Sequence, residues 1–193
     1  MNEIESKLKD IIAYEHVFAF KLGEQVLEKP EMKTWMLFIP FVAVVHMYRR
    51  QKYLAARNKF VAGFLTTRQW ALSEAGRVVA DGKKKDVKTI SSQAEMPETA
   101  RESHIEIIDI LVDNYVNLLE APGENMDMLI RNAYGSRADY LQYMERLSRA
   151  ESRFNAALEP HLNEKYNQAT ETIKKIEVVS GRMRKEEARR VFP

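Results

Sequence analysis

Histidine and glutamate side chains are the residues of this sequence that could hold a metal ion. The four histidines are spread one to each of four predicted helical segments: His16, His46, His104 and His161. His16 and His46 lie about equally far from Pro30, where we expect the chain to turn between its first two helices. They should therefore lie level on neighbouring helices, with Glu15 beside them in sequence. Glu15, His16 and His46 are the candidate ligands of a metal or haem site.

The motifs that accompany such chemistry are missing from the sequence. Di-iron bundles use Glu-x-x-His pairs on two helices, and no such pair occurs here. The sequence has no cysteine, which excludes disulfides, thiolate zinc sites and a cysteine nucleophile. It also lacks the Gly-x-Ser-x-Gly, phosphate-loop and His-Glu-x-x-His motifs. Histidines buried with hydrogen-bond partners are the simpler interpretation, so we expect no cofactor and favour a non-enzymatic role.

A basic cluster on the second predicted helix could contact an acidic partner. It contains Arg49, Arg50, Lys52 and Arg57, with Tyr53 among them. The whole sequence, however, has 30 basic and 28 acidic residues, a formal charge of only +2. Balanced charge of this kind is typical of solvated helix faces, whereas nucleic-acid-binding proteins concentrate one sign on one face. We therefore do not expect nucleic acid as a partner.

The most apolar stretch of the sequence precedes this cluster. Residues 35–53, from Trp35 to Tyr53, read WMLFIPFVAVVHMYRRQKY, and the charge-free part ends at Tyr48. This part is too short to cross a membrane, which requires about 20 apolar residues. Its aromatic and basic ends could lie at a membrane surface, but an interfacial helix also requires a polar face that the stretch lacks. Burial against other helices is the favoured interpretation.

The spacing of apolar residues predicts an all-α fold with one domain over residues 1–193. We expect a bundle of four to six helices with two long members, about 31–79 and 136–188. Pro40 should kink or split the first of these, and Pro160 should give the second a kink or divide it into two consecutive helices. Shorter helices are predicted over about 2–28, 98–121 and 124–134. An exposed linker at about 81–97 and a frayed basic tail at about 182–193 complete the prediction.

Two apolar stripes along the long helices supply the function hypothesis. The first seam is Leu54, Val61, Leu65 and Leu72, and the second seam is Leu141, Met144, Phe154 and Ile173. Their heptad-like spacing suits helix pairing, and the shorter helices offer too little surface to cover both. The sequence therefore predicts an interaction or assembly protein that forms a homodimer through these seams.

Two alternatives stay open beside assembly. A metal or a small apolar ligand could bind between the first two helices near His16 and His46, and residues 35–53 could attach the protein to a membrane surface. The N-terminal residues MNEIESKLKD lack the features of a signal peptide, so we expect a cytoplasmic location.

Overall fold

The computed structural model describes residues 3–29, 40–164 and 169–193, with side chains of the second helix described from residue 49 onward. Seven helices occur in these ranges and no strand, which confirms the predicted all-α class. They are α1 (Glu3–Val26), α2 (Pro40–Asp81), α3 (Val87–Ser92), α4 (Glu98–Glu120), α5 (Met126–Tyr134), α6 (Arg137–Asn163) and α7 (Ala169–Val191). The number of helices exceeds the predicted four to six for two reasons. The predicted linker at 81–97 contains the short helix α3, and the predicted long helix at 136–188 is divided into α6 and α7.

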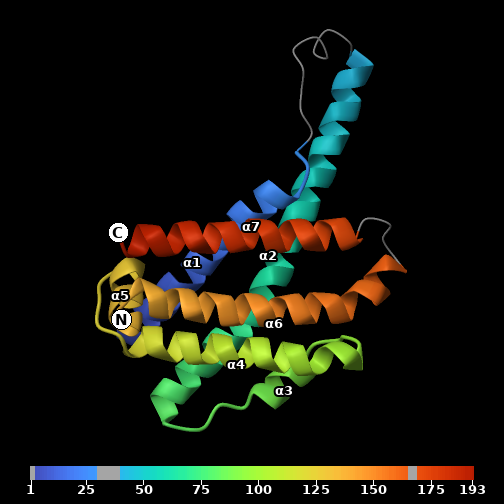
Figure 1. The fold of residues 1–193 in the computed structure, drawn as a ribbon. Helices are drawn as coiled ribbons and strands as arrows, with labels where there is room; N and C mark the ends of the chain where they lie inside the picture. Colours follow the sequence, from blue (N-terminus) through green and yellow to red (C-terminus); the bar gives the residue numbers. More distant parts are fainter. Residues whose placement is uncertain (1–2, 30–39, 165–168) are drawn as a thin grey trace.

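Helix α4 is the centre of the bundle. It packs against α2 on one side and α6 on the other, while α1 packs on α2 and α7 packs on α6. Figure 1 shows α4, α6 and α7 running side by side, with α2 crossing them steeply. Ile108, Leu111, Val112 and Tyr115 of α4 are fully shielded from solvent. The apolar face predicted for this helix is therefore the main contributor to the core.

Helix α2 is the longest element, with 42 residues, or about 63 Å at 1.5 Å per residue. It continues without a break through Gly63, which is therefore not a helix end. Its first part extends beyond the other helices in Figure 1. The predicted start near residue 31 lies outside the described residues. Pro40 is the first described residue of α2, so the predicted kink or split there stays a prediction.

The segment predicted as one long helix over residues 136–188 is an antiparallel pair, α6 and α7 (Figure 1). Pro160 lies in the last turn of α6, and the helix ends at Asn163. Proline at this position removes the backbone hydrogen bond to the carbonyl of residue 156, so it weakens only the last turn of the helix. The two halves of the predicted helix pack on each other.

The segment over residues 81–97 is not a uniformly exposed linker. Asp86 accepts a hydrogen bond from the Thr89 backbone amide at 3.2 Å and so caps the short helix α3. Ile90 and Ser91 of this helix are buried against α4. The segment was predicted to be a linker because it is mostly polar and its apolar residues are too few to show helical spacing.

The C-terminal residues are held in place as well. Helix α7 continues to Val191, and both Ala188 and Val191 are fully buried. Arg131 donates a hydrogen bond to the Val191 carbonyl at 2.5 Å, and Arg190 pairs with Asp127 at 2.6 Å. The predicted frayed tail is therefore an ordered helix end, because its charges meet partners on α5.

A buried lysine joins the first helix to the end of α4. The Lys7 Nζ atom donates hydrogen bonds to the carbonyl oxygens of Leu119 and Ala121 at 3.1 and 3.0 Å. These carbonyls lie at the C-terminus of α4, where a helix leaves acceptors unpaired and where positive charge is favourable. Lys7 therefore fixes the position of α1 against α4.

Candidate functional site

Two of the three predicted metal ligands, Glu15 and His16, face different surroundings in the structure. Glu15 faces the interior, where it accepts hydrogen bonds from Arg68 and Tyr115, whereas His16 is exposed. The side chain of His46 lies outside the described residues. In the part of the chain that the structure describes, no group of three His, Cys, Asp or Glu residues could hold a metal ion. Glu15 is instead a partner of a buried arginine.

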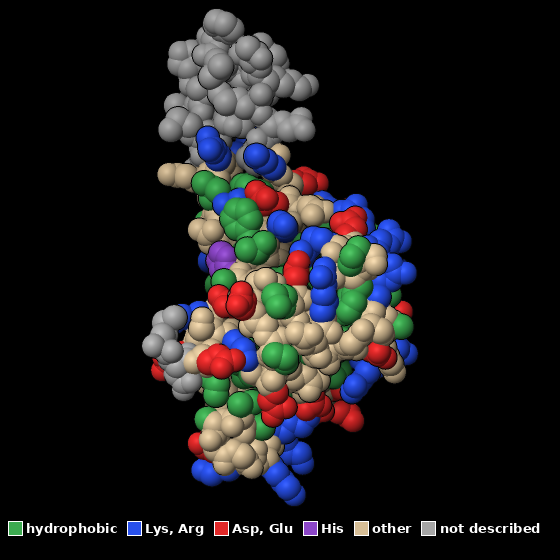
Figure 2. All heavy atoms as spheres, turned by 90° about the vertical axis from the view of Figure 1, so that its left-hand side faces the viewer, with side chains coloured by type: hydrophobic (Ala, Val, Ile, Leu, Met, Phe, Trp, Pro, Cys, Tyr) green, Lys and Arg blue, Asp and Glu red, His purple; other side chains and the backbone are tan. Residues whose placement is uncertain are grey.

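The basic cluster divides into two environments. Arg49, Arg50 and Lys52 are exposed. Arg57 is not, because its guanidinium lies 4.3 Å from the centre of the Phe20 ring and pairs with Glu24 at 3.4 Å. Figure 2 shows a face of the bundle on which positive and negative side chains alternate. Within the described residues, no helix is long and apolar enough to cross a membrane.

The two seams are largely covered within one chain. Val61, Leu65, Leu72 and Met144 are buried, while Leu141 and Phe154 pack on the main core. Leu54 is 37% exposed and Ile173 is half-buried. The surplus of apolar surface that suggested a dimer is thus taken up by intramolecular packing, chiefly because residues 136–188 fold back as a hairpin. Self-association itself stays a prediction.

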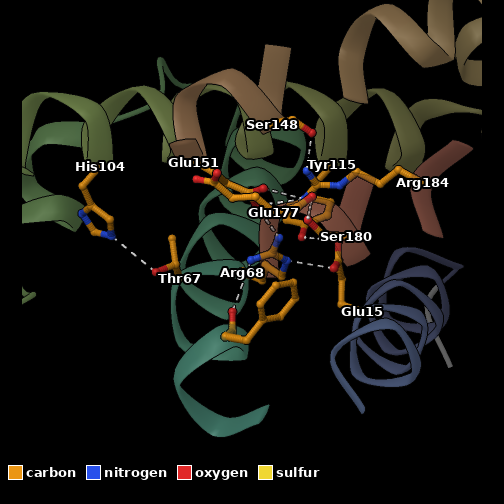
Figure 3. Close-up of polar contacts among 11 residues, drawn as sticks. Glu15, Thr67, Arg68, His104, Tyr115, Ser148, Glu151, Glu177, Ser180 and Arg184 are labelled. Atoms are coloured by element: carbon orange, nitrogen blue, oxygen red, sulfur yellow. Dashed lines mark hydrogen bonds and ion pairs between the residues drawn. The ribbon is translucent and has the colours of Figure 1, made fainter. Parts of the chain in front are cut away.

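Four charged side chains from four helices form a buried cluster, which we call the ion cluster: Glu15, Arg68, Glu151 and Arg184 (Figure 3). Arg68 donates to Glu15 at 2.9 Å and to Glu151 at 3.0 Å. Arg184 pairs with Glu151 at 2.7 Å, and the Tyr115 hydroxyl donates to Glu15 at 2.8 Å. Both arginine side chains are only 6% exposed. Two positive and two negative groups therefore balance each other inside the bundle.

Charge pairing in the ion cluster opposes the effect of burial on the pKa values of Glu151 and Arg68. Burial alone would raise the pKa of the Glu151 carboxyl, but the guanidinium groups of Arg184 and Arg68 hold it below its ordinary value. Burial likewise opposes the charged form of Arg68, yet Glu15 and Glu151 raise its pKa. Burial, followed by the charge of Glu15, raises the pKa of Tyr115 well above its usual range, so its hydroxyl stays a donor.

His104 forms a second polar group nearby. Its Nδ1 atom lies 2.9 Å from the Ser91 hydroxyl. Its Nε2 atom lies 3.3 Å from the Thr67 hydroxyl (Figure 3). Burial, together with the positive charge of Arg101, lowers the pKa of His104 to about 4. The ring is therefore neutral near physiological pH, with one nitrogen donating and the other accepting. His104 fits the expectation of a buried, hydrogen-bonded histidine, whereas His16 and His161 are exposed and do not.

Both polar groups lie on the wall of a cavity of about 600 Å³ between α2, α4 and the α6–α7 hairpin. Arg68, Arg184 and Glu151 line one part of it, and Thr67 and His104 line another. The rest of the wall is mostly apolar: Phe60, Phe64, Phe154, Leu158, Leu162 and Ile176. The Arg68 guanidinium also lies over the Phe64 ring, 3.5 Å from its centre. We call this space the hairpin cavity.

A second hollow of about 650 Å³ lies between α1 and α7. Charged side chains such as Asp10, Lys21 and Glu186 line much of it, and each of these three is exposed. Ligand sites are typically apolar with a few converging polar groups, a description that fits the hairpin cavity better than this groove.

The sequence analysis considered Glu15, His16 and His46 and overlooked Arg68 and Glu151. The informative signal was a charged residue inside an apolar stripe: Arg68 lies between Leu65 and Leu72, and Glu151 lies between Leu147 and Phe154. A charge that is buried at such a position loses its hydration, so it must be paired or become neutral. In comparisons with models of known protein families, with curated proteins and with solved structures, nothing matches this chain.

Proposed function

We propose that this protein binds a small, largely apolar molecule in the hairpin cavity. The observation that carries the proposal is the cavity itself, whose volume of about 600 Å³ suits a small-molecule site. This deepens the sequence-based alternative of an apolar-ligand bundle and moves its site from the surroundings of His16 to the space beside Arg68.

Two features of the wall support a binding role over a packing defect. The cavity opens to solvent and extends inward to the buried side chains of Leu22, Arg68 and His104, so a ligand would find both an entrance and a shielded interior. Its wall also carries ionised and hydrogen-bonded groups with shifted pKa values, Glu151 and His104, and such groups concentrate at functional sites. Aromatic rings supply the apolar contact area, and the polar groups would fix the orientation of the ligand.

Gly63 offers a way to fill the cavity without disturbing the fold. It lines the hairpin cavity within α2, and a Cβ atom built there would meet no atom within 4 Å. Because glycine is a poor helix former, Gly63→Phe should not destabilise the helix through its backbone. Gly181→Phe is the matched control, since Gly181 is also helical with open space at its Cβ and does not line the cavity.

The experiment is a fluorescence titration with phenylnaphthylamine, a neutral apolar dye that brightens when it leaves water. The wild-type protein and Gly181→Phe should bind it with similar affinity, and Gly63→Phe should bind it at least about tenfold more weakly, a loss of 1.4 kcal/mol. Absence of binding to wild type, or equal binding to Gly63→Phe, would rule out the hairpin cavity as the site.

A further inference from the structure

We infer that the hairpin cavity selects uncharged ligands and rejects organic anions of the same shape. The inference rests on the proposed function, because it assumes that a ligand enters this cavity. It concerns a different property, the charge of the ligand, which the ion cluster determines.

Buried arginines in a cavity would ordinarily suggest a site for a carboxylate or another anion. Here both arginines already have anionic partners within the chain. Arg68 is bonded to Glu15 and Glu151, and Arg184 to Glu151 and to the Ser148 hydroxyl at 2.6 Å. Arg68 also donates to the Phe64 carbonyl at 3.3 Å. The positive charge is therefore compensated before any ligand arrives.

At the buried end of the cavity an added anion would meet no net positive charge, because Glu15 and Glu151 balance Arg68 and Arg184. Besides Glu151, the cavity wall carries Glu177, which accepts a hydrogen bond from Asn155 at 3.1 Å. Lys59 also lines the cavity, but its side chain is exposed and thus well solvated. A carboxylate or sulfonate beside the ion cluster would lose its hydration and meet only arginines that already have carboxylate partners.

The remaining polar groups suit a neutral molecule. His104 is uncharged near physiological pH because its pKa is lowered to about 4, and the Thr67 hydroxyl beside it is also neutral. Both line the cavity. The ring nitrogens of His104 are engaged by Ser91 and Thr67, so the Thr67 hydroxyl offers its remaining hydrogen-bonding capacity to a ligand without a net charge, next to rings that cover an apolar body. The ligand class is therefore an uncharged, mainly apolar or aromatic molecule with a weakly polar group.

Two dyes with one skeleton isolate the effect of ligand charge. Phenylnaphthylamine is neutral, and anilinonaphthalene sulfonate adds a sulfonate to the same ring system. The ratio of their dissociation constants measures discrimination by charge and cancels most of the shared apolar contact. Wild-type protein should bind the sulfonate at least about tenfold more weakly than the neutral dye.

Two substitutions then change the charge of the cavity wall. Glu151→Gln leaves one arginine charge uncompensated, and it should lower the sulfonate-to-neutral ratio by about tenfold, the size expected for unit charges roughly 10 Å apart in a dielectric of about 20. Glu177→Gln should lower the ratio in the same direction by a smaller factor, and it leaves both arginines with their partners. Glu171→Gln is the matched control, because Glu171 is exposed on α7 and does not line the cavity.

The outcomes separate the two proposals. If neither dye binds the cavity, the proposed function fails. If the neutral dye binds and is lost in Gly63→Phe, but the sulfonate binds equally well, the function stands and charge selection is overturned. Charge selection is also overturned if Glu151→Gln and Glu177→Gln, both folded by circular dichroism, leave the ratio unchanged.

Discussion

The substitution Arg68→Met should destabilise the protein strongly, because it removes the centre of the ion cluster. Arg68 is bonded to Glu15 at 2.9 Å and to Glu151 at 3.0 Å, and its side chain is 6% exposed. Methionine keeps the apolar stem and removes the charge. Removing one partner of a buried ion pair typically costs 3–5 kcal/mol, roughly. Because Glu151 keeps Arg184 and Glu15 keeps the Tyr115 hydroxyl, we expect about 3 kcal/mol, near the low end of that range.

The assay is urea denaturation followed by far-ultraviolet circular dichroism. In thermal denaturation, the same loss of about 3 kcal/mol would lower Tm by about 7 °C for a chain of this size. The matched control is Arg153→Met, whose ion pair with Glu106 at 2.5 Å is about half exposed and should contribute at most about 1 kcal/mol.

The pH dependence identifies the cause of the loss. The pKa of Glu151 is lower in the folded state than in the unfolded state, so its pairing stabilises the protein above the unfolded pKa of about 4.3. That stability is lost as the pH falls through the folded pKa. The difference between wild type and Arg68→Met should therefore shrink at about pH 3. A loss below about 1 kcal/mol at neutral pH, or a difference that is the same at both pH values, would refute the reasoning.

Three further predictions concern residues away from the ion cluster. Lys7→Met should lower the free energy of unfolding by about 2 kcal/mol in urea denaturation, because it leaves the buried carbonyls of Leu119 and Ala121 without their charged donor; an unchanged midpoint would contradict this. The pKa of His104 is about 4 in the folded state, against about 6.5 unfolded, so wild type should lose roughly 3 kcal/mol as the pH falls from 6.5 to 4. His104→Gln should remove that slope, and an identical pH profile would show that another group titrates. Gly82→Ala should lower Tm by a few degrees, because Gly82 has φ of 65°, which alanine tolerates poorly; a raised Tm would show that the turn can relax.

Local sequence chemistry predicted several helix ends accurately. The prediction of helices over 98–121 and 124–134 agrees with α4 and α5, which end before Pro122 and at Gly135. Ser136 was expected to cap the following helix, and its hydroxyl accepts a hydrogen bond from the Asp139 backbone amide at 3.1 Å. Such ends depend on neighbouring residues only, so their signals are complete in the sequence.

The reversal between α6 and α7 could not be predicted in the same way. Apolar residues recur at helical spacing on both sides of the turn, and Pro160 drew attention to a position inside α6. The spacing of apolar residues shows which face of a helix is apolar. It does not show whether that face packs against a helix of the same chain or against a second copy of the chain. The dimer hypothesis treated the apolar residues of α6 and α7 as one continuous exposed stripe, whereas the two helices pack on each other.

The candidate site depended on contacts that are distant along the chain. Arg68 and Glu151 are 83 residues apart, and Arg68 and Glu15 are 53 apart. Each charge lies in an apolar stripe, so its burial was readable from the sequence, but the identity of its partner was not. The metal hypothesis rested on the histidines because histidine is a common metal ligand. The importance of Arg68 follows only from its buried position between Glu15 and Glu151, which the sequence does not show.

The most direct test of the binding proposal is a crystal structure of the protein soaked with bromonaphthalene, read through the anomalous signal of bromine. The account predicts a bromine peak in the hairpin cavity, within contact of Phe60, Phe64 or Phe154. A peak confined to the groove between α1 and α7, or an empty hairpin cavity at a saturating concentration of the ligand, would contradict it.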